Sequence, residues 1–343
     1  MKKINTVEVT QKEEWEAYVS SREEANFLSS WNWGDFHKRL DKQVFYRGYY
    51  QNKTLLGVSL LVKETAKRGK YLTIAGGPLL DWKNQELIRA WVEDINSIAK
   101  REKCLFVRVR PQILDTPEHR HLFSSYRFKP SPMHVTADLT LQLDLKQSQE
   151  TLLAQMRKST RYEIKKAEKL GIVVKTSSDP DEINQFYEHQ LFLAKKHGFI
   201  PFGKKFLKTQ FEIFSNENQA LLFHSYDNQA GLLATAFIIM YGNEAVYHYG
   251  ISTDKNRRLP GSYACQWAAI KEAKKRGIER YNFWGIAPQE ASNDHRFSGV
   301  SLFKRGFGGQ EVAYLPAHDL ATSAFYPFIK AFETFRAKKR NLD

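Results

Sequence analysis

Residues 220–251 read ALLFHSYDNQAGLLATAFIIMYGNEAVYHYGI, and this stretch decides the fold class. Three runs rich in apolar and aromatic residues, 220–226, 231–241 and 244–251, are typical of β-strands. Asp227 and Asn228, between the first two runs, form a polar turn signal. The stretch therefore predicts a three-stranded meander.

A helix and one further strand are expected after this meander. Residues 262–275 place their alanines on the less polar side of a helix, and Gly277 suits its C-terminal cap. Residues 280–284 (RYNFW) are predicted to form the strand. Two helical segments, 150–170 and 180–197, precede the meander. The order in this half of the chain is thus helix, helix, meander, helix, strand.

The first half of the chain repeats this order. Its predicted helices are 13–19, 31–39 and 86–100, and its predicted strands are 44–50, 54–63, 70–75 and 105–109. A repeated order of this kind indicates an α/β protein with two similar domains. The order resembles the acyltransferase fold shared by acetyl-CoA-dependent N-acetyltransferases, in which a mixed sheet is flanked by helices.

We therefore expect two acyl-CoA N-acyltransferase-like (GNAT-type) domains in tandem. The first is expected to cover residues 1–146 and the second 147–318, because the alternation of apolar residues stops near Lys146. The C-terminal segment, 319–343, is rich in aromatic residues at helical spacing. We expect it to contain a helix that returns to pack on the first domain.

The composition restricts the classes of function. The chain carries 52 Lys and Arg against 38 Asp and Glu, a formal net charge of +14. An anionic partner is therefore expected: nucleic acid, a nucleotide-linked substrate or the anionic inner face of a membrane. A basic protein with no such partner is the alternative. Only two cysteines are present, so a disulfide-rich scaffold is excluded.

The expected location is the cytoplasm. The N-terminal sequence lacks the apolar region of a secretory signal. No apolar stretch approaches the ~20 residues that a transmembrane helix requires. Peripheral contact with the anionic inner membrane face is a further expectation from the positive charge.

Four cations recur at four-residue spacing, at Arg157, Arg161, Lys165 and Lys169. On a helix this spacing drifts by ~40° per step, so the four side chains are predicted to lie along one face. A one-faced cationic helix suits the phosphates of RNA, because neutralising them gives affinity that does not depend on sequence. The alternative is a solvated helix face with local pairing to glutamates.

The loop before the 262–275 helix departs from the pattern of acetyl-CoA enzymes, in which a glycine-rich loop presents backbone amides to pyrophosphate. Arg258 and Gly261 keep part of that pattern, but Tyr263 stands where a smaller residue would allow close approach. CoA binding is therefore disfavoured, and no cofactor is expected.

Residues 301–309 (SLFKRGFGG) combine three glycines with two cations and two phenylalanines. We predict a tight turn that holds Lys304 against a ligand. A basic β-hairpin turn with buried phenylalanines is the alternative.

Both cysteines lie in apolar surroundings and are predicted core residues. His119 and His121 stand apart from other histidines, so no metal site is expected.

Three motifs occur in order along the chain: 157–167 (RKSTRYEIKKA), 282–286 (NFWGI) and 303–309 (FKRGFGG). Together they resemble the FemA/FemB/FemX peptidyltransferases, which build the peptidoglycan interpeptide bridge. The compact FemX-like form is the closer one, because no long helical arm separates the 150–170 and 180–197 helices. The resemblance implies transfer of an amino acid from aminoacyl-tRNA to the stem-peptide amine of a precursor that is either UDP-linked or lipid-linked.

The resemblance also implies catalytic and tRNA-binding roles. The expected catalytic residues are Lys304 and Phe303. Lys304, preceded by Phe303, matches the family's lysine that supports the reaction and binds the donor end of tRNA. An aminoacyl ester is already activated, so the reaction needs positioning and charge stabilisation rather than an enzyme nucleophile. The residues expected to contact tRNA are Arg157, Arg161, Lys165, Lys169 and Arg305.

The residues expected to bind the acceptor substrate are Lys38, Tyr247, Tyr249 and Arg258. His37 and Lys38 are alternative registers for a contact with the nucleotide diphosphate. The two tyrosines are alternatives for the family's muropeptide-contacting tyrosine. The family's arginine after the 180–197 helix has no clear match, which leaves the form of the acceptor open.

Two rival functions follow from the same residues. A CoA-dependent N-acyltransferase acting on a small molecule or a protein is disfavoured by Tyr263. A non-catalytic RNA-binding protein of the same fold is disfavoured by the Lys304 segment.

Overall fold

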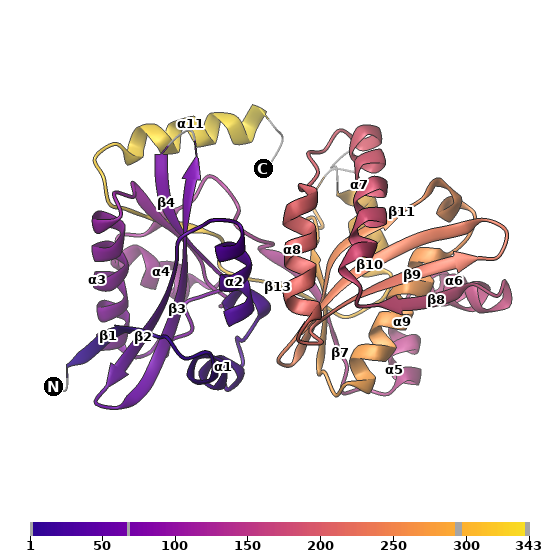
Figure 1. Cartoon of the computed structure of the whole chain (residues 1–343), viewed down its shortest axis with the longest axis horizontal. Coiled ribbons are helices and arrows are strands. Elements are labelled where there is room, and N and C mark those ends of the chain that lie inside the picture. The colour runs from indigo at the N-terminus through magenta and orange to yellow at the C-terminus, as the bar shows by residue number, and fades with distance from the viewer. Residues whose placement is uncertain (1–2, 67–68, 292–296, 340–343) are drawn as a thin grey trace. The chain divides into compact units, whose positions relative to one another are not determined.

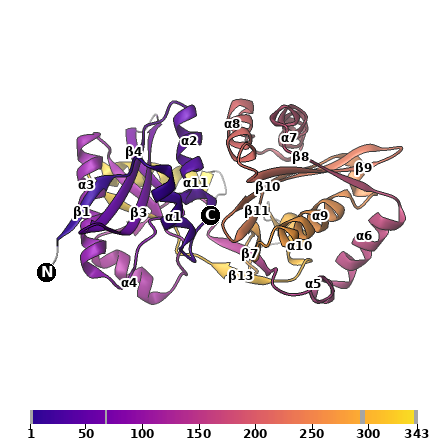
Figure 2. The same cartoon turned by 60° about the horizontal axis from the view of Figure 1, so that its bottom comes forward.

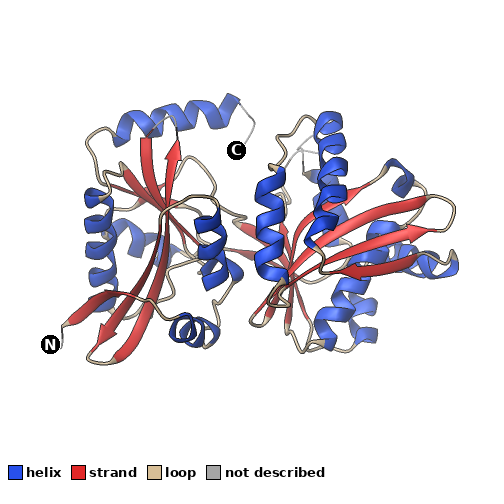
Figure 3. Cartoon of the chain, in the orientation of Figure 1, coloured by secondary structure: helices blue, strands red, loops and turns tan. Residues whose placement is uncertain are grey.

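The computed structural model describes residues 3–66, 69–291 and 297–339. The chain divides into two compact units, one formed by residues 1–138 and 313–343 and the other by residues 139–312. In the described part of the chain, each unit contains a β-sheet flanked by helices, as Figure 3 shows. The expected α/β class, with a mixed sheet in each unit, is confirmed.

The sheet of the first unit has the strand order β1-β2-β3-β4-β5-β14-β6, and Figure 1 labels β1 to β4. Its strands are β1 (Ile4–Glu8), β2 (Val44–Gln51), β3 (Thr54–Ala66), β4 (Gly69–Ala75), β5 (Phe106–Arg110), β6 (Lys129–Pro130) and β14 (His318–Ala321). Its helices are α1 (Lys12–Ser20), α2 (Trp31–Arg39), α3 (Gln85–Arg101), α4 (Pro117–Ser125) and α11 (Tyr326–Lys339). The apolar face of α3, which includes Trp91 and Ile95, forms one core cluster with Leu72 and Val107 of the sheet.

The sheet of the second unit has the order β13-β7-β12-β11-β10-β9-β8. Its strands are β7 (Leu139–Asp144), β8 (Val173–Ser177), β9 (Ala220–Asp227), β10 (Gly231–Tyr241), β11 (Glu244–Ser252), β12 (Arg280–Gly285) and β13 (Gln310–Ala313). Its helices are α5 (Gln149–Gln155), α6 (Lys158–Lys169), α7 (Ile183–His197), α8 (Lys204–Ser215), α9 (Gly261–Lys275) and α10 (Ser298–Arg305). Helices α7 and α8 cover one face of this sheet, and α5, α6, α9 and α10 lie on the other (Figure 2).

Each unit has a parallel pair of central strands, β4 with β5 and β11 with β12. The β11–β12 pairing is short: it runs from Glu244 opposite Arg280 to Val246 opposite Asn282. Beyond these residues β11 continues to Ser252 without β12 as a partner. The carboxyl ends of the two strands are therefore free to present side chains and carbonyls to a third element.

The division between the units differs from the expected boundary at residue 146. Leu139–Asp144 forms β7, and Arg280–Asn282 of β12 pairs with its second half. The strand therefore belongs to the sheet of the second unit. The C-terminal segment also supplies a strand that was not expected, β14, which lies between β5 and β6.

Two local predictions are wrong. Residues 150–170 do not form one helix, because Met156 and Arg157 are extended and separate α5 from α6. Residues 301–309 are not a simple turn or hairpin, because Ser301 to Arg305 belong to α10. The turn begins only after the helix, where Gly308 and Gly309 adopt positive φ angles of 82° and 90°.

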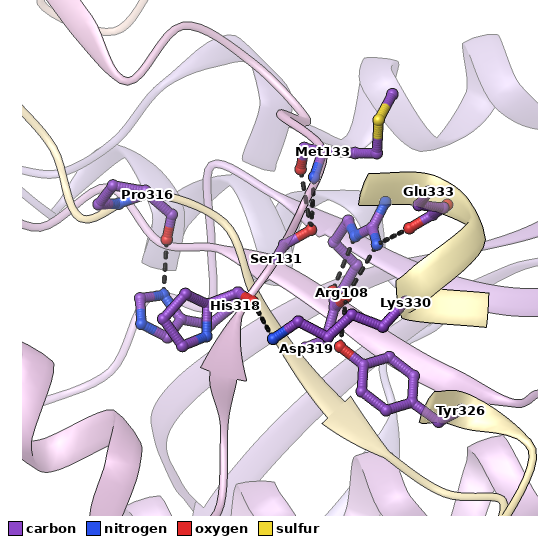
Figure 4. Close-up of polar contacts among 10 residues, drawn as sticks. Arg108, Ser131, Met133, Pro316, His318, Asp319, Tyr326, Lys330 and Glu333 are labelled. Carbon is purple, nitrogen blue, oxygen red and sulfur yellow. Dashed lines mark hydrogen bonds and ion pairs between the residues drawn. The ribbon is translucent and has the colours of Figure 1, made fainter. Parts of the chain in front are cut away.

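The C-terminal helix α11 packs on the first unit. Tyr326 and Ile329 form a cluster with Phe106 of β5. Beside this cluster the guanidinium of Arg108 donates to both carboxylate oxygens of Asp319, at 2.7 and 2.8 Å, and to Glu333 at 2.6 Å (Figure 4). These contacts attach α11 to β5 and β14.

Candidate active site

Lys304 lies in the last turn of α10, and its side chain is only 7% exposed. Its Nζ donates a hydrogen bond of 2.7 Å to the carbonyl oxygen of Gly285, the last residue of β12. The same Nζ lies 5.7 Å from the ring centroid of Tyr247 on β11. The ammonium group therefore contacts both strands just beyond the point where they stop pairing.

Burial lowers the pKa of Lys304 to about 7. The cause is desolvation of the charged form, and no ion pair to Lys304 is found within the described ranges. The side chain can therefore change its protonation state near neutral pH. When protonated, it is a cation held in a poorly solvated position, where its effect on a nearby developing negative charge is strong.

Three side chains of α10 hold the segment that follows β12. The hydroxyl of Ser301 accepts a 2.8 Å hydrogen bond from the amide of Ala287. The guanidinium of Arg305 donates to the carbonyl of Ala287 at 2.7 Å, and Lys304 binds the carbonyl of Gly285. The position of Lys304 relative to the end of β12 is thus fixed by several contacts.

An aromatic cluster fixes α10 from its other side. The ring of Phe303 lies 5.0 Å from that of Tyr263 and 5.3 Å from that of Phe307. Phe307 is fully buried and also contacts Phe283 of β12, at 5.0 Å. Phe303 is half-buried in this cluster. Its contacts are those of a residue that positions Lys304.

The end of β12 has an unusual backbone. Trp284 adopts a φ of 64°, a left-handed conformation that large residues rarely adopt. Its amide donates to the side-chain oxygen of Asn282 at 2.8 Å, and the amide nitrogen of Asn282 donates to Glu244 at 3.0 Å. This turn precedes the Gly285 carbonyl that Lys304 binds. Motif 282–286 was noticed in the sequence, but its role as the partner of Lys304 was not.

The structure separates the two candidate tyrosines. The pairing of β10 with β11 advances from Ile238 opposite Tyr247 to Phe237 opposite Tyr249, so His248 is the extra residue of a β-bulge. Tyr247 packs against the core cluster on the α9 face, beside Lys304. Tyr249 contacts Phe237 and His248, at 5.6 and 3.9 Å. Of the two tyrosines, Tyr247 is the one beside Lys304.

The two alternative residues for the diphosphate contact, His37 and Lys38 near the end of α2, differ in exposure. His37 is 6% exposed and packs against Trp33 and Phe36. Burial lowers its pKa to about 3, so its imidazole is neutral at pH 7. Lys38 is accessible, with its Nζ 3.3 Å from the carboxylate of Asp35 and 4.5 Å from the ring centroid of Tyr46. Lys38 is the residue of this pair that can meet an anionic ligand.

The loop before α9 makes several contacts within the second unit. Arg258 is exposed, but its carbonyl accepts a 3.5 Å hydrogen bond from Lys166. The amide of Ser262 is already capped at 2.8 Å by the side-chain oxygen of Asn256. The ring of Tyr263 packs on Phe303. One helix N-terminal amide is therefore already hydrogen-bonded within the protein.

The expected cationic stripe is only partly formed. Arg157 precedes α6 and donates to Ser159 at 2.9 Å, and Arg161 donates to the carbonyls of Ala154 and Met156 at the end of α5. Both are thus engaged with local structure. Lys165 and Lys169 are exposed on α6 and keep their charges in solvent. The prediction that four cations share one helix is wrong because of the break at Arg157.

Arg305 is also engaged within its own unit. Its Nε donates to Glu311 at 2.6 Å, and its terminal nitrogen donates to the carbonyl of Ala287. Although it is next to Lys304 in α10, it is about 100° further round the helix. The charge of Arg305 is therefore paired, whereas that of Lys304 contacts a neutral carbonyl.

The remaining candidate groups are the histidines and cysteines considered from the sequence. His119 and His121 line a surface groove of about 720 Å³ in the first unit, together with Arg22, Glu24 and Trp82. No group of three or more His, Cys, Asp or Glu suited to a metal ion is found where the chain is described. Both cysteines are buried. Within the residues that the structure describes, no helix is long and apolar enough to cross a bilayer.

Comparison with known proteins places these features in one family. The model of the FemAB family matches residues 10–122, 129–223 and 204–334. The chain belongs to the FemAB family. It is 23% identical over 372 residues to aminoacyltransferase FemA of Staphylococcus epidermidis, covering 84% of this chain and 88% of that protein. To FemA of Staphylococcus aureus it is 22% identical over 347 residues, covering 77% and 82%. This FemAB protein is a transferase enzyme.

Solved structures agree on the fold. The crystal structure of FemX superimposes with a TM-score of 0.84 at 16% sequence identity, covering 96% of this chain and 100% of FemX. A tandem GNAT protein from the clavulanic acid biosynthesis pathway gives a TM-score of 0.58 at 11% identity, covering 94% and 98%. The expected resemblance to the FemA/FemB/FemX proteins and the tandem GNAT-type fold are both confirmed.

Proposed function

We propose that this FemAB protein transfers an amino acid from aminoacyl-tRNA to the stem-peptide amine of a peptidoglycan precursor in the cytoplasm. The observation that carries the proposal is the buried Lys304, held between the ends of β11 and β12 with its Nζ on the Gly285 carbonyl. Membership of a family that contains aminoacyltransferase FemA supports the class of reaction.

The chemistry requires little beyond positioning and charge stabilisation. The acceptor amine attacks the carbonyl carbon of the aminoacyl ester, and negative charge develops on the carbonyl oxygen. The bond to the ribose oxygen then breaks, and this departing oxygen takes up the proton that the amine loses, so that the tRNA leaves with a free hydroxyl. In this scheme protonated Lys304 stabilises the oxygen that becomes negative, because it is a fixed cation in a poorly solvated position.

The other residues are assigned by their accessibility. Lys165 and Lys169 of α6 are exposed cations that suit the phosphates of tRNA. Tyr247, next to Lys304, is assigned to the acceptor peptide in preference to Tyr249. Lys38, rather than His37, is assigned to the diphosphate of the acceptor. Arg258 is assigned to substrate binding as an exposed cation in the loop before α9.

An acceptor assay tests the proposal. Pools of charged tRNA are incubated with the protein and either a UDP-linked muropeptide or a lipid-linked precursor, and transfer of labelled amino acid is measured. We expect transfer to one of these acceptors with the wild type and a loss of ~10²–10³ in rate with Lys304→Met. If neither acceptor is labelled while acetyl-CoA binds at micromolar concentration, the CoA-dependent alternative replaces the proposal.

A further inference from the structure

Helix α11 presents a wholly apolar face to solvent. Every exposed residue between Ala324 and Phe335 is apolar: Ala324, Phe325, Pro327, Phe328, Ala331, Phe332 and Phe335. Four of them are phenylalanines, with exposed fractions of 68% (Phe325), 74% (Phe328), 51% (Phe332) and 67% (Phe335). We call these four residues the phenylalanine face. Contiguous exposed aromatic surface of this kind marks an interaction site.

The opposite side of the helix is fixed to the first unit and keeps this face outward. Tyr326, Ile329, Glu333 and Ala337 are all buried. The hydroxyl of Tyr326 donates to Asp319 at 2.9 Å, and Glu333 accepts from Arg108 at 2.6 Å (Figure 4). Rolling the helix to hide the phenylalanine face would break a buried ion pair, which is strongly unfavourable.

Cations outnumber acids in this part of the sequence. Residues 322–343 contain five cations and two acids: Glu333, which is buried against Arg108, and the C-terminal Asp343. Lys330 and Arg336 flank the phenylalanine face on the helix itself. Lys330 donates to the carbonyl of Pro130, which brings the exposed Lys129 of β6 beside the helix.

This combination fits a lipid surface with anionic headgroups. Aromatic side chains insert at the boundary between headgroups and acyl chains, while flanking lysines and arginines remain at the level of the phosphates. A groove on a protein partner would bury the phenylalanines but gives no reason for the excess of cations in this segment. We propose that α11 is an interfacial helix that docks the protein on an anionic membrane surface through its phenylalanine face.

This inference does not rest on the proposed transferase reaction, because lipid binding is measured without tRNA or muropeptide. The full-length protein is mixed with vesicles of phosphatidylcholine alone or with ~30% phosphatidylglycerol, and the bound fraction is measured by flotation. We expect binding to the anionic vesicles that weakens as salt is raised, and weaker binding to the neutral ones.

The decisive variant is Phe328→Ser/Phe332→Ser. Removing two exposed aromatic side chains should weaken partitioning onto anionic vesicles by about tenfold or more. The matched control, Leu114→Ser/Val173→Ser, removes two apolar side chains that are 54% and 49% exposed elsewhere. It should bind as the wild type does. Arg336→Gln should lower binding to anionic vesicles by ~5-fold and binding to neutral vesicles much less.

Several results would overturn the proposal. Equal binding of the Phe328→Ser/Phe332→Ser variant and the wild type, with both folded by circular dichroism, would show that α11 is not the docking element. Absence of wild-type binding to either vesicle would exclude a lipid surface. If the wild type is then a dimer in sedimentation experiments and the variant a monomer, a second copy of the chain is the occupant instead.

Discussion

Replacing Lys304 by Met is expected to make the protein more stable and the enzyme slower. Burial lowers the pKa of this lysine from 10.5 to about 7. At about 1.4 kcal/mol per pH unit, holding the side chain in this position costs the folded state about 4 kcal/mol at pH 7. Methionine keeps the apolar stem but leaves the Gly285 carbonyl without its donor, which costs about 1–3 kcal/mol. The free energy of unfolding should therefore rise by about 1–3 kcal/mol.

The pH dependence of this difference has a definite sign. The folded-state pKa of Lys304 lies below the unfolded one, so the unfolded chain binds more protons between about pH 7 and 10.5. The penalty for burying the lysine is complete below this window and disappears as the pH rises through it. Lys304→Met should therefore be more stable than the wild type at pH 7, and it should be no more stable than the wild type at pH 10, where the cost of the Gly285 carbonyl without its donor outweighs the remaining penalty.

Urea denaturation at both pH values measures the stabilities, and single-turnover transfer with saturating charged tRNA measures the rates. We expect a rate loss of ~10²–10³ for Lys304→Met. Arg305→Met is the matched control: it removes a neighbouring cation that is already paired with Glu311. Its rate should stay within a few-fold of the wild type, and its stability should fall by about 1 kcal/mol or less.

Two results would refute this reasoning. If Lys304→Met lowers the free energy of unfolding by several kcal/mol at pH 7, the lysine is a structural anchor and not a strained functional group. If Arg305→Met loses activity while Lys304→Met keeps it, Arg305 and not Lys304 supplies the catalytic charge.

Three further predictions concern other parts of the molecule. Lys165→Ala/Lys169→Ala should weaken binding of all tRNAs in filter-binding assays and reduce the slope of log affinity against log salt concentration by about one unit per lost contact. An unchanged slope would show that both lysines are ordinary solvated residues. Lys38→Met should weaken binding of a UDP-linked muropeptide about tenfold in calorimetry without changing Tm, and unaltered affinity would remove Lys38 from the acceptor site. Arg108→Met should lower the free energy of unfolding by about 3–5 kcal/mol in urea, since it removes the guanidinium that bridges two buried carboxylates, and a loss below about 1 kcal/mol would contradict the importance of that cluster.

The meander of the second unit was predictable because most residues of its strands are buried. The expected strands 220–226, 231–241 and 244–251 differ from β9, β10 and β11 by at most one residue at each end. A central strand with helices on both sides carries a continuous apolar run, and such a run is the clearest strand signal in a sequence.

The helix α10 was missed because its buried side is polar. Ser301 and Lys304 are its buried residues, while Leu302 is 58% exposed. A helix whose inward face binds backbone groups at the end of β12 does not show the apolar spacing from which helices are predicted. The polar residues that carry the proposed chemistry are thus also the reason why α10 is not recognised as a helix from the sequence.

The break at Met156 and Arg157 depends on a partner far along the chain. The amide of Arg157 donates to the carbonyl of Gly306 at 2.9 Å, and Met156 is buried in the core of the second unit. The local sequence is compatible with continuous helix, so only this tertiary contact decides the outcome. The pairing of β7 with β12 is non-local in the same way, and the alternation of apolar residues before Lys146 does not show which sheet this segment joins.

Because β14 lies between β5 and β6, the first unit cannot finish folding while the ribosome is still making the second. Residues 1–138 emerge with one edge of β5 unpaired and with Arg108 lacking both of its carboxylates. That incomplete sheet must persist through the synthesis of residues 139–312, roughly 10–35 seconds at ~5–20 residues per second. The second unit is continuous in sequence and needs no such delay. The half of the protein that is translated first is therefore the half that is completed last.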